Sequence, residues 1–218
     1  DKYLYVGDRT YSYNKYKNIY VISFGKAAFN MAKGTGEILK NKIKEGLIIS
    51  NTIKCDKLSG FRFLESSHPV PNQRSINAAK EIIKILNKTD ENDLIIFLIS
   101  GGGSSIVALP EEGISLEDKK LTTEILLKSG IDINTLNAVR KRISLIKGGG
   151  LLKYSYPTDV ISLIISDVVG DNIDVIASGP TVPDKSDFKV AWQEIVDLGI
   201  HNKLPKKVFS KLEGIHKD

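Results

Sequence analysis

Apolar residues fall along this chain in short unbroken runs, separated by longer stretches in which apolar positions recur every three or four residues. The clearest run, from Leu94 to Ile99, carries no polar residue and stops at Ser100 and three glycines. A strand without polar alternation is buried on both faces, as central strands of a parallel sheet are. The pattern predicts an α/β protein with helices on both faces of the sheet.

The same pattern places the other elements. We expect strands at residues 19–24, 47–50, 61–65, 94–99 and 160–165. Helices are expected over about residues 26–44, 72–88, 115–130, 132–147 and 187–198, several of them beginning at an Asn, Ser or Asp that can cap them. A hairpin over residues 3–13 comes first, and a peripheral helix or an approach to a linker comes last. The strand–helix alternation is typical of a doubly wound, mostly parallel, Rossmann-like sheet.

Composition narrows the class of protein. The chain has 218 residues, 41% of them hydrophobic and 26% charged, as in an ordinary globular domain. Its net charge of +5 is spread among interleaved acidic residues without a basic run, so we expect no nucleic-acid partner. Cys55 is the single cysteine, which excludes an intramolecular disulfide and suits a cytoplasmic location. No apolar stretch approaches the roughly 20 residues of a membrane span, so we expect no membrane partner.

The turn after the central strand is the first candidate site. It consists of small residues that can expose backbone N–H groups to an anion or supply hydroxyl donors, namely Ser100, Gly101, Gly102, Gly103, Ser104 and Ser105. Ligands of open α/β sheets bind just beyond such strand ends. The alternative is a glycine turn that only allows close packing. No lysine follows at the spacing of a nucleotide-binding P-loop, and no GxGxxG fingerprint is present in the turn.

Two further turns could face the same crevice. Lys26 follows the strand at residues 19–24, at the expected first turn of a helix, where a cation is best tolerated beside an anionic ligand. His68 lies in Ser67-His-Pro-Val-Pro71, where it could contact a ligand or move a proton. The alternatives are an exposed lysine and a rigid turn.

The helix predicted over residues 132–147 carries a polar face. Asn137, Arg140, Lys141 and Ser144 recur at helical spacing, and Arg140 is the best candidate to grip a carboxylate or phosphate through two parallel hydrogen bonds. Lys147, ahead of three glycines, could do the same. A charged helix face can equally be one that is simply solvated.

The strand at residues 160–165 is followed by carboxylates. Asp167 and Asp171 could hold a divalent cation against a nucleotide, or could only shape the turn. Ser178, Gly179 and Thr181 form a further turn that could receive an anion.

Taken together, these stretches resemble the glycerate 2-kinases of the two-domain MOFRL type. The matching stretches are residues 25–28, 68–71, 100–104, 137–141 with 146–149, and 165–171 with 177–184, in the family's order. The family's first turn usually reads Gly-Ala-Gly-Lys, where this chain has Ser23-Phe24-Gly25-Lys26, and Gly150 stands where a longer residue is common.

The resemblance implies phosphorylation of glycerate, commonly to 2-phosphoglycerate, with ATP and a divalent cation such as Mg²⁺. Lys26 matches the family's lysine that contacts ATP or the transferring phosphate. It further implies that residues 1–218 are an N-terminal Rossmann-like domain trimmed at its start, that a smaller C-terminal domain is absent, and that the chain alone is inactive. Its partners would be glycerate and a nucleotide, and a homodimer is compatible with this interpretation.

Within that interpretation the glycine turn would cradle an anionic group and Lys26 would neutralise the transferred phosphoryl group. Arg140 would grip the glycerate carboxylate or a phosphate, and Asp167 would place Mg²⁺ or accept the proton of the attacking hydroxyl. Two other hypotheses stay open. One is a non-catalytic anion-binding or regulatory fragment. The other is an NAD(P)-dependent oxidoreductase, which would need the GxGxxG turn that the first strand lacks.

Overall fold

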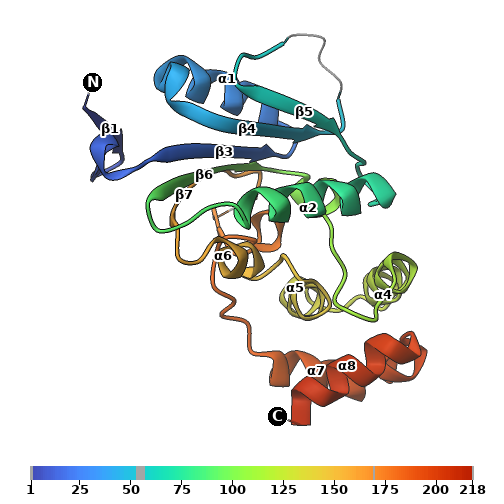
Figure 1. The fold of residues 1–218 in the computed structure, drawn as a ribbon. Helices are drawn as coiled ribbons and strands as arrows, with labels where there is room; N and C mark the ends of the chain where they lie inside the picture. The colour runs from blue at the N-terminus through green and yellow to red at the C-terminus, as the bar shows by residue number, and fades with distance from the viewer. Residues whose placement is uncertain (1, 53–56, 169, 218) are drawn as a thin grey trace.

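The computed structural model describes residues 2–52, 57–168 and 170–217, so Cys55 lies outside the described residues. Its centre is a five-stranded, fully parallel sheet with the strand order β5-β4-β3-β6-β7 (Figure 1). The strands are β3 (Asn18–Phe24), β4 (Ile43–Ser50), β5 (Phe61–Glu65), β6 (Asp93–Ser100) and β7 (Asp159–Ile165). The predicted α/β, doubly wound sheet is therefore confirmed, and β6, buried along its whole length, is a central strand as expected.

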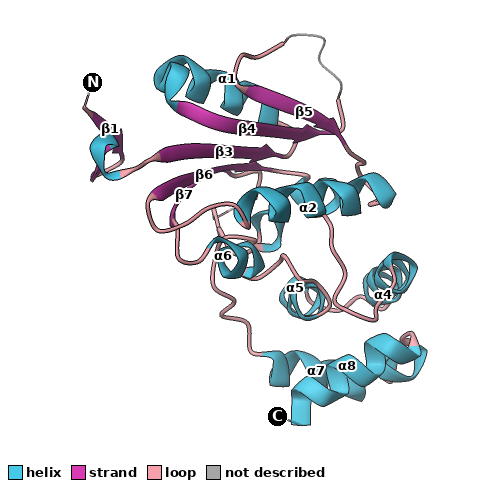
Figure 2. Ribbon diagram, in the orientation of Figure 1, coloured by secondary structure: helices cyan, strands magenta, loops and turns pink. Residues whose placement is uncertain are grey.

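Helices cover both faces of this sheet, as Figure 2 shows. On one face, α1 (Ala28–Leu39) packs on apolar side chains of β3, β4 and β6. On the other face, α2 (Gln73–Leu86) and α6 (Gly150–Ser155) pack on the alternate side chains of the same strands. Each large apolar side chain that is fully buried, such as Ile22 or Phe97, stabilises the fold by roughly 1.5–3 kcal/mol.

The remaining helices form a separate layer beyond α2 and α6 (Figure 1). They are α4 (Leu116–Lys128), α5 (Ile133–Arg142), α7 (Phe188–Asp197) and α8 (Lys206–Lys217). Their apolar faces share a core of their own, built around Leu126, Val139, Trp192 and Leu212. Val208 and Leu212 of α8 are fully buried, so the C-terminal helix is an integral part of this layer.

The N-terminal residues form the expected hairpin, β1 (Tyr3–Val6) with β2 (Arg9–Ser12), which packs against the α1 face of the sheet. Short helical segments complete the chain. They are α3 (Gly103–Ile106) and the 3₁₀ turns Tyr13–Lys15, Lys40–Lys42, Ile176–Ser178 and Ile200–Lys203. Within the described part of the chain, no helix combines the length and apolar character needed to cross a membrane.

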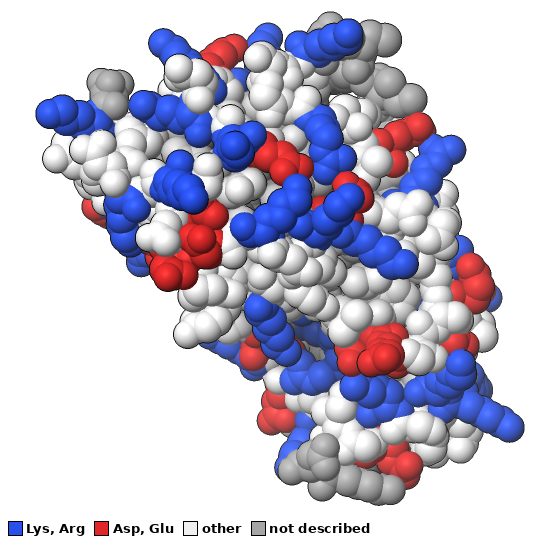
Figure 3. Space-filling view, viewed as in Figure 1, with Lys and Arg blue, Asp and Glu red and all other residues white. Residues whose placement is uncertain are grey.

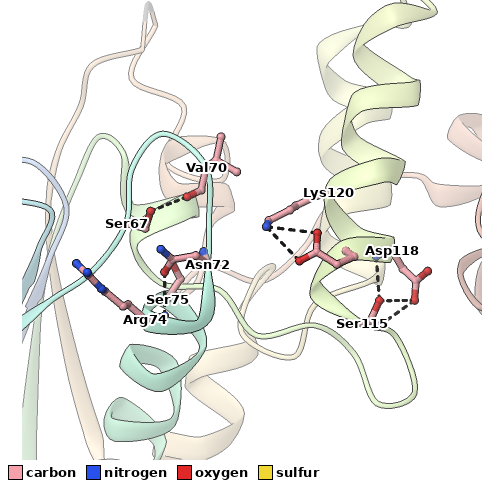
Figure 4. Close-up of polar contacts among 9 residues, drawn as sticks. Ser67, Val70, Asn72, Arg74, Ser75, Ser115, Asp118 and Lys120 are labelled. Carbon is pink, nitrogen blue, oxygen red and sulfur yellow. Dashed lines mark hydrogen bonds and ion pairs between the residues drawn. The ribbon is translucent and has the colours of Figure 1, made fainter.

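Two of the predicted caps are present as complete capping boxes (Figure 4). Asn72 accepts a hydrogen bond from the backbone of α2 while Ser75 accepts one from the Asn72 N–H. Ser115 and Asp118 do the same at the start of α4. Such caps satisfy N–H groups that have no partner inside the helix and contribute about 1 kcal/mol each.

Two helices are shorter than the sequence predicts. The prediction of a helix from residue 26 is wrong because the Lys26 N–H donates to Gly101 O at 2.9 Å, so Lys26 precedes α1 and belongs to the turn. α5 ends at Arg142 rather than near residue 147. There the backbone pairs instead with the segment after α3, through Glu111 N to Ile143 O and Leu145 N to Leu109 O, both 3.1 Å.

Candidate functional site

The glycine turn, Gly101–Gly103, lies at the end of β6 and is crowded on every side. A Cβ at Gly101 would collide with the Asp167 carboxylate, whose Oδ1 would be 2.8 Å away. A Cβ at Gly103 would lie 2.8 Å from the Ala177 side chain. Gly102 alone of the three adopts a left-handed backbone, with φ at +82°. The turn therefore requires glycine for close approach at two positions and for conformation at the third.

Three polar side chains converge on this turn from three different strand ends. Besides Asp167 from the end of β7, His68 and Lys26 both approach Gly102. A Cβ there would lie 2.9 Å from His68 Cδ2 and 3.2 Å from Lys26 Cγ. Lys26, His68 and Asp167 are called the strand-end group below. Lys26 and Asp167 are exposed and His68 is half-buried, so the group opens to solvent.

The imidazole of His68 is tuned by its neighbours. Partial burial lowers its pKa below the usual value, and the nearby Lys26 ammonium lowers the pKa further. At neutral pH the ring is therefore neutral and has one nitrogen that can accept a hydrogen bond or a proton.

The two serines at the ends of the turn have structural partners. Ser100 Oγ accepts a hydrogen bond from the Ala27 N–H at 3.0 Å, which fastens the β3–α1 turn to the end of β6. Ser105 Oγ donates to Gly102 O at 3.1 Å. Of the three predicted hydroxyl donors, only Ser104 is directed at other side chains of the predicted site.

Ser104 contacts a second cluster of charged side chains. Lys147, which is 3% exposed, donates from Nζ to Ser104 Oγ at 2.8 Å and to Ala177 O at 3.3 Å. Ser104 Oγ also shares a hydrogen bond of 2.8 Å with Ser178 Oγ. Burial lowers the pKa of Lys147 well below its usual value, and repulsion by Arg140 and Lys119 lowers the pKa further.

Arg140 on α5 and Lys119 on α4 complete what is called the cationic group, with Lys147. Burial lowers the pKa of the Arg140 guanidinium. Burial and the charge of Arg140 lower the pKa of Lys119 to about 7. Among the described residues none of the three cations forms a salt bridge, although they lie close enough to repel one another. Such an arrangement favours an anion.

The backbone beside the cationic group is strained. Ala177, Ser178 and Gly179 follow one another with φ of +52°, +62° and +60°. A left-handed conformation in a residue other than glycine costs on the order of 1–3 kcal/mol and is held by its surroundings. Here it brings Ala177 O to Lys147 Nζ and Ser178 Oγ to Ser104 Oγ.

The remaining predicted site residues do not contact the strand-end group or the three cations through a hydrogen bond within the described chain. Asn137 and Lys141 line a cavity of about 510 Å³, and Lys141 Nζ forms salt bridges with Asp174 at 2.8 Å and Asp184 at 3.2 Å. Gly179 packs against the backbone, since a Cβ there would lie 2.9 Å from Asp174 O. Thr181 Oγ1 is buried without a hydrogen-bond partner in the described chain.

Asp171 is exposed and takes a left-handed backbone with φ at +51°, in the loop that also carries Asp167. The described residues contain no group of three or more His, Cys, Asp or Glu side chains arranged to hold a metal ion.

Sequence reasoning did not single out Lys119. It lies between Asp118 and Lys120 in a helix of mixed charge, where a lysine is expected to be solvated. The one available signal is position: Lys119 is four residues after the capping residue Ser115 and three before Thr122, which is buried.

Comparison with known proteins gives a consistent result. Residues 2–213 match the family model described as a domain of unknown function, DUF4147. A "Glycerate 2-kinase" of Pyrococcus horikoshii is 47% identical over 195 residues, which cover 89% of this chain and 44% of that protein. A solved structure of a protein from the same organism superposes with a TM-score of 0.90 at 44% identity, covering 98% of this chain and 48% of that one. The chain thus spans about half the length of the relatives it matches.

One relative carries a different name. A "Putative hydroxypyruvate reductase" of Agrobacterium vitis is 43% identical over 162 residues, covering 74% of this chain and 42% of that protein. In this chain the turn after β3 offers little room for a dinucleotide. A Cβ at Gly25 would lie 2.6 Å from Ser100 O, so the turn is packed against the end of β6.

Proposed function

This chain belongs to the DUF4147 family, the N-terminal domain of MOFRL-type glycerate kinases, and from that premise we propose that it carries the phosphoryl-transfer site of an ATP-dependent glycerate 2-kinase. In this reaction the 2-hydroxyl oxygen of glycerate bonds to the γ-phosphorus of ATP. The bond from that phosphorus to the β–γ bridging oxygen breaks, and ADP, 2-phosphoglycerate and a proton are released.

The observation that carries the proposal is the convergence of Lys26, His68 and Asp167 on the glycine turn. Phosphoryl transfer needs little covalent chemistry from the protein, but it needs positive charge and exact placement of the reactants. The Lys26 side chain approaches Gly102, and its ammonium, close enough to His68 to lower the pKa of the imidazole, supplies positive charge at a turn whose backbone N–H groups can meet phosphate oxygens. Because the pKa of His68 is lowered, its neutral ring can orient or accept a proton from the attacking hydroxyl.

The family implies a divalent cation, and the residues that follow β7 could supply one or two carboxylate ligands to it. Mg²⁺ in nucleotide sites is bound by one or two carboxylates and keeps its other positions for water and phosphate oxygens. Asp167 is exposed beside Gly101, and Asp171 lies in the same loop, so these are the residues that would hold Mg²⁺. When bound, the ion would neutralise charge on the phosphates of the nucleotide.

The strand-end group is open to solvent, and transfer to an alcohol rather than to water requires a closed site. We propose that the second domain of MOFRL-type kinases closes over this group in the complete protein. The single cysteine further favours a cytoplasmic location for that protein.

The test is ADP release in a coupled assay with D-glycerate, ATP and MgCl₂, measured on the complete protein and on this chain alone. We expect glycerate-dependent release from the complete protein and little from the chain alone. Asp167→Asn should lower kcat at least about a hundredfold, since it removes a group proposed to act in the transition state. Asp197→Asn, which changes a carboxylate on α7 hydrogen-bonded to Gln193, should leave kcat unchanged.

Two results would redirect the assignment. Tight phosphate binding without ADP release by the complete protein would favour a non-catalytic anion-binding domain. Oxidation of NADH or NADPH on addition of hydroxypyruvate would favour the reductase named for the Agrobacterium relative.

A further inference from the structure

The amine of Lys119 is the least explained polar group of the site. Its side chain is 5% exposed, and Nζ has no hydrogen-bond partner in the described part of the chain. Burial of an ammonium group without a partner is strongly unfavourable, so such groups lose their proton or are paired with a ligand. Nothing in the packing of α4 accounts for a lysine at this position.

The carboxylates nearest in sequence are occupied elsewhere. Asp118 accepts hydrogen bonds from Ser115 at the start of α4 (Figure 4). Glu117 forms a salt bridge with Lys120. The charges that do reach Lys119 are positive, since Arg140 lowers the pKa of Lys119, and Lys119 and Arg140 together lower the pKa of Lys147. The missing partner of this cluster is negative.

Resting on the proposed function, we propose that Lys119, Arg140 and Lys147 bind the carboxylate of the acid substrate, and that Lys119 selects an acid over an uncharged alcohol. Arg140 has the planar donor pair that fits two carboxylate oxygens. Lys147 is held by Ser104 and Ala177, which fixes its ammonium at the edge of the glycine turn. Lys119 adds a third donor from the opposite helix.

A carboxylate on a small molecule suits this group better than the phosphates of a nucleotide do. Lys119 and Lys147 are 5% and 3% exposed, so their amines are closed to a group as large as a nucleotide. The exposed Lys26 and Asp167 are accessible to a large ligand that enters from solvent. Ser104 follows the glycine turn and contacts Lys147, so an acid held by its carboxylate at the cationic group would lie next to the turn that the strand-end group approaches.

The lowered pKa values have a measurable consequence. Without an anion the cationic group holds fewer protons at pH 8 than three solvated cations would, because the pKa of Lys119 is about 7. A bound carboxylate favours the protonated amines. Binding of D-glycerate at pH 8 should therefore take up protons, and the observed binding enthalpy should depend on the ionisation enthalpy of the buffer.

The test compares D-glycerate and ADP binding by calorimetry in the complete wild-type protein and in Lys119→Met. The variant keeps most of the side-chain length and removes the charge. We expect D-glycerate affinity to fall about tenfold to a hundredfold, as for loss of a hydrogen bond to a charged group, with ADP affinity within about twofold. The preference for D-glycerate over glycerol in kcat/KM should fall by a similar factor. Lys128→Met, at an exposed position of the same helix, is the matched control and should change none of these.

The outcomes separate the two proposals. If wild type turns over D-glycerate and Lys119→Met binds it with unchanged affinity, the carboxylate assignment is wrong and the proposed function stands. If the variant loses ADP affinity instead, the cationic group serves the nucleotide. If wild type neither releases ADP with D-glycerate nor binds it, both proposals fail. Should Lys119→Met not fold, absence of proton uptake by wild type at pH 8 would contradict the assignment.

Discussion

The strand-end group and the cationic group both adjoin the segment Gly101–Ser104, yet they differ in almost every physical respect. Lys26 and Asp167 are exposed and of opposite charge. Lys119 and Lys147 are buried and of like charge, with Arg140 beside them. The exposed group suits a ligand that arrives with its own metal ion and leaves after each turnover. The buried group suits a small anion that must be recognised and kept dry.

Basic residues elsewhere sharpen this contrast. On the face shown in Figure 3, Lys and Arg side chains are interleaved with Asp and Glu over α2 and β5. Arg62 pairs with Glu45 and Glu81, and Arg74 pairs with Glu65 at 2.6 Å. Exposed pairs of this kind contribute at most about 1 kcal/mol each. The cationic group differs because Lys119 and Lys147 are buried and none of its three members has a carboxylate partner among the described residues.

The largest expected effect tests the exposed side. Lys26→Met removes the ammonium next to Gly102 and keeps most of the side chain. We expect kcat of the complete protein to fall about a hundredfold or more, as for other preorganised charges that act on the transition state. The measurement is kcat from steady-state kinetics. Lys33→Met, which changes an exposed lysine of α1, is the control and should keep the wild-type kcat. A similar kcat in both variants would mean that Lys26 is an ordinary surface lysine, and the strand-end group would then have no role in catalysis through this residue.

A smaller effect tests the link between the groups. Ser104→Ala removes the hydroxyl that Lys147 Nζ contacts at 2.8 Å, whereas Ser105→Ala removes one that only bonds Gly102 O. KM for D-glycerate should rise about tenfold in Ser104→Ala, in line with the loss of one hydrogen bond to a charged group, and change little in Ser105→Ala. Equal changes in the two variants would mean that the turn acts as one packing unit.

The smallest effect concerns stability and pH. The folded-state pKa of Lys119 is about 7 and its unfolded value is 10.5, so between these pH values the unfolded chain binds more protons. The free energy of unfolding should therefore rise with pH across this window, by up to about 1.4 kcal/mol per pH unit for each such lysine. Urea unfolding without ligand at pH 7, 8 and 9 should show a shallower rise in Lys119→Met than in Lys128→Met. Identical slopes would mean that Lys119 is solvated.

The sequence predicted the sheet well because its strands are mostly apolar and end in small or polar residues. The exception is β4, which begins at Ile43, four residues before the expected strand and inside the stretch predicted as helix, because Lys44 and Glu45 interrupt its apolar pattern. β5 (Phe61–Glu65) was placed to the residue. The helix ends were harder, since nothing in the local pattern around residues 143–147 shows that the backbone pairs with Leu109 and Glu111. α3 and α6, with four and six residues, are too short to show a period.

Site residues that follow a strand could be predicted from the sequence, whereas a site residue that is buried by tertiary packing could not. Lys26, His68 and Asp167 could be proposed because the carboxyl ends of parallel strands meet at one edge. Lys119 could not, because its burial results from the packing of α4 against α5 and α8, which the local charge pattern does not show. The binding roles of Ser178, Gly179 and Thr181 stay predictions, although Ser178 does lie beside Ser104.

The turn between β3 and α1 is hydrogen-bonded to the end of β6, and this limits how the protein can be redesigned. Ser100 Oγ holds the Ala27 N–H, Gly101 O holds the Lys26 N–H, and no side chain fits at Gly25. A loop grafted between β3 and α1, for instance to accept a different nucleotide, would lose both hydrogen bonds at once. The turn is therefore not an exchangeable module, and libraries that vary it should vary the end of β6 in the same clone.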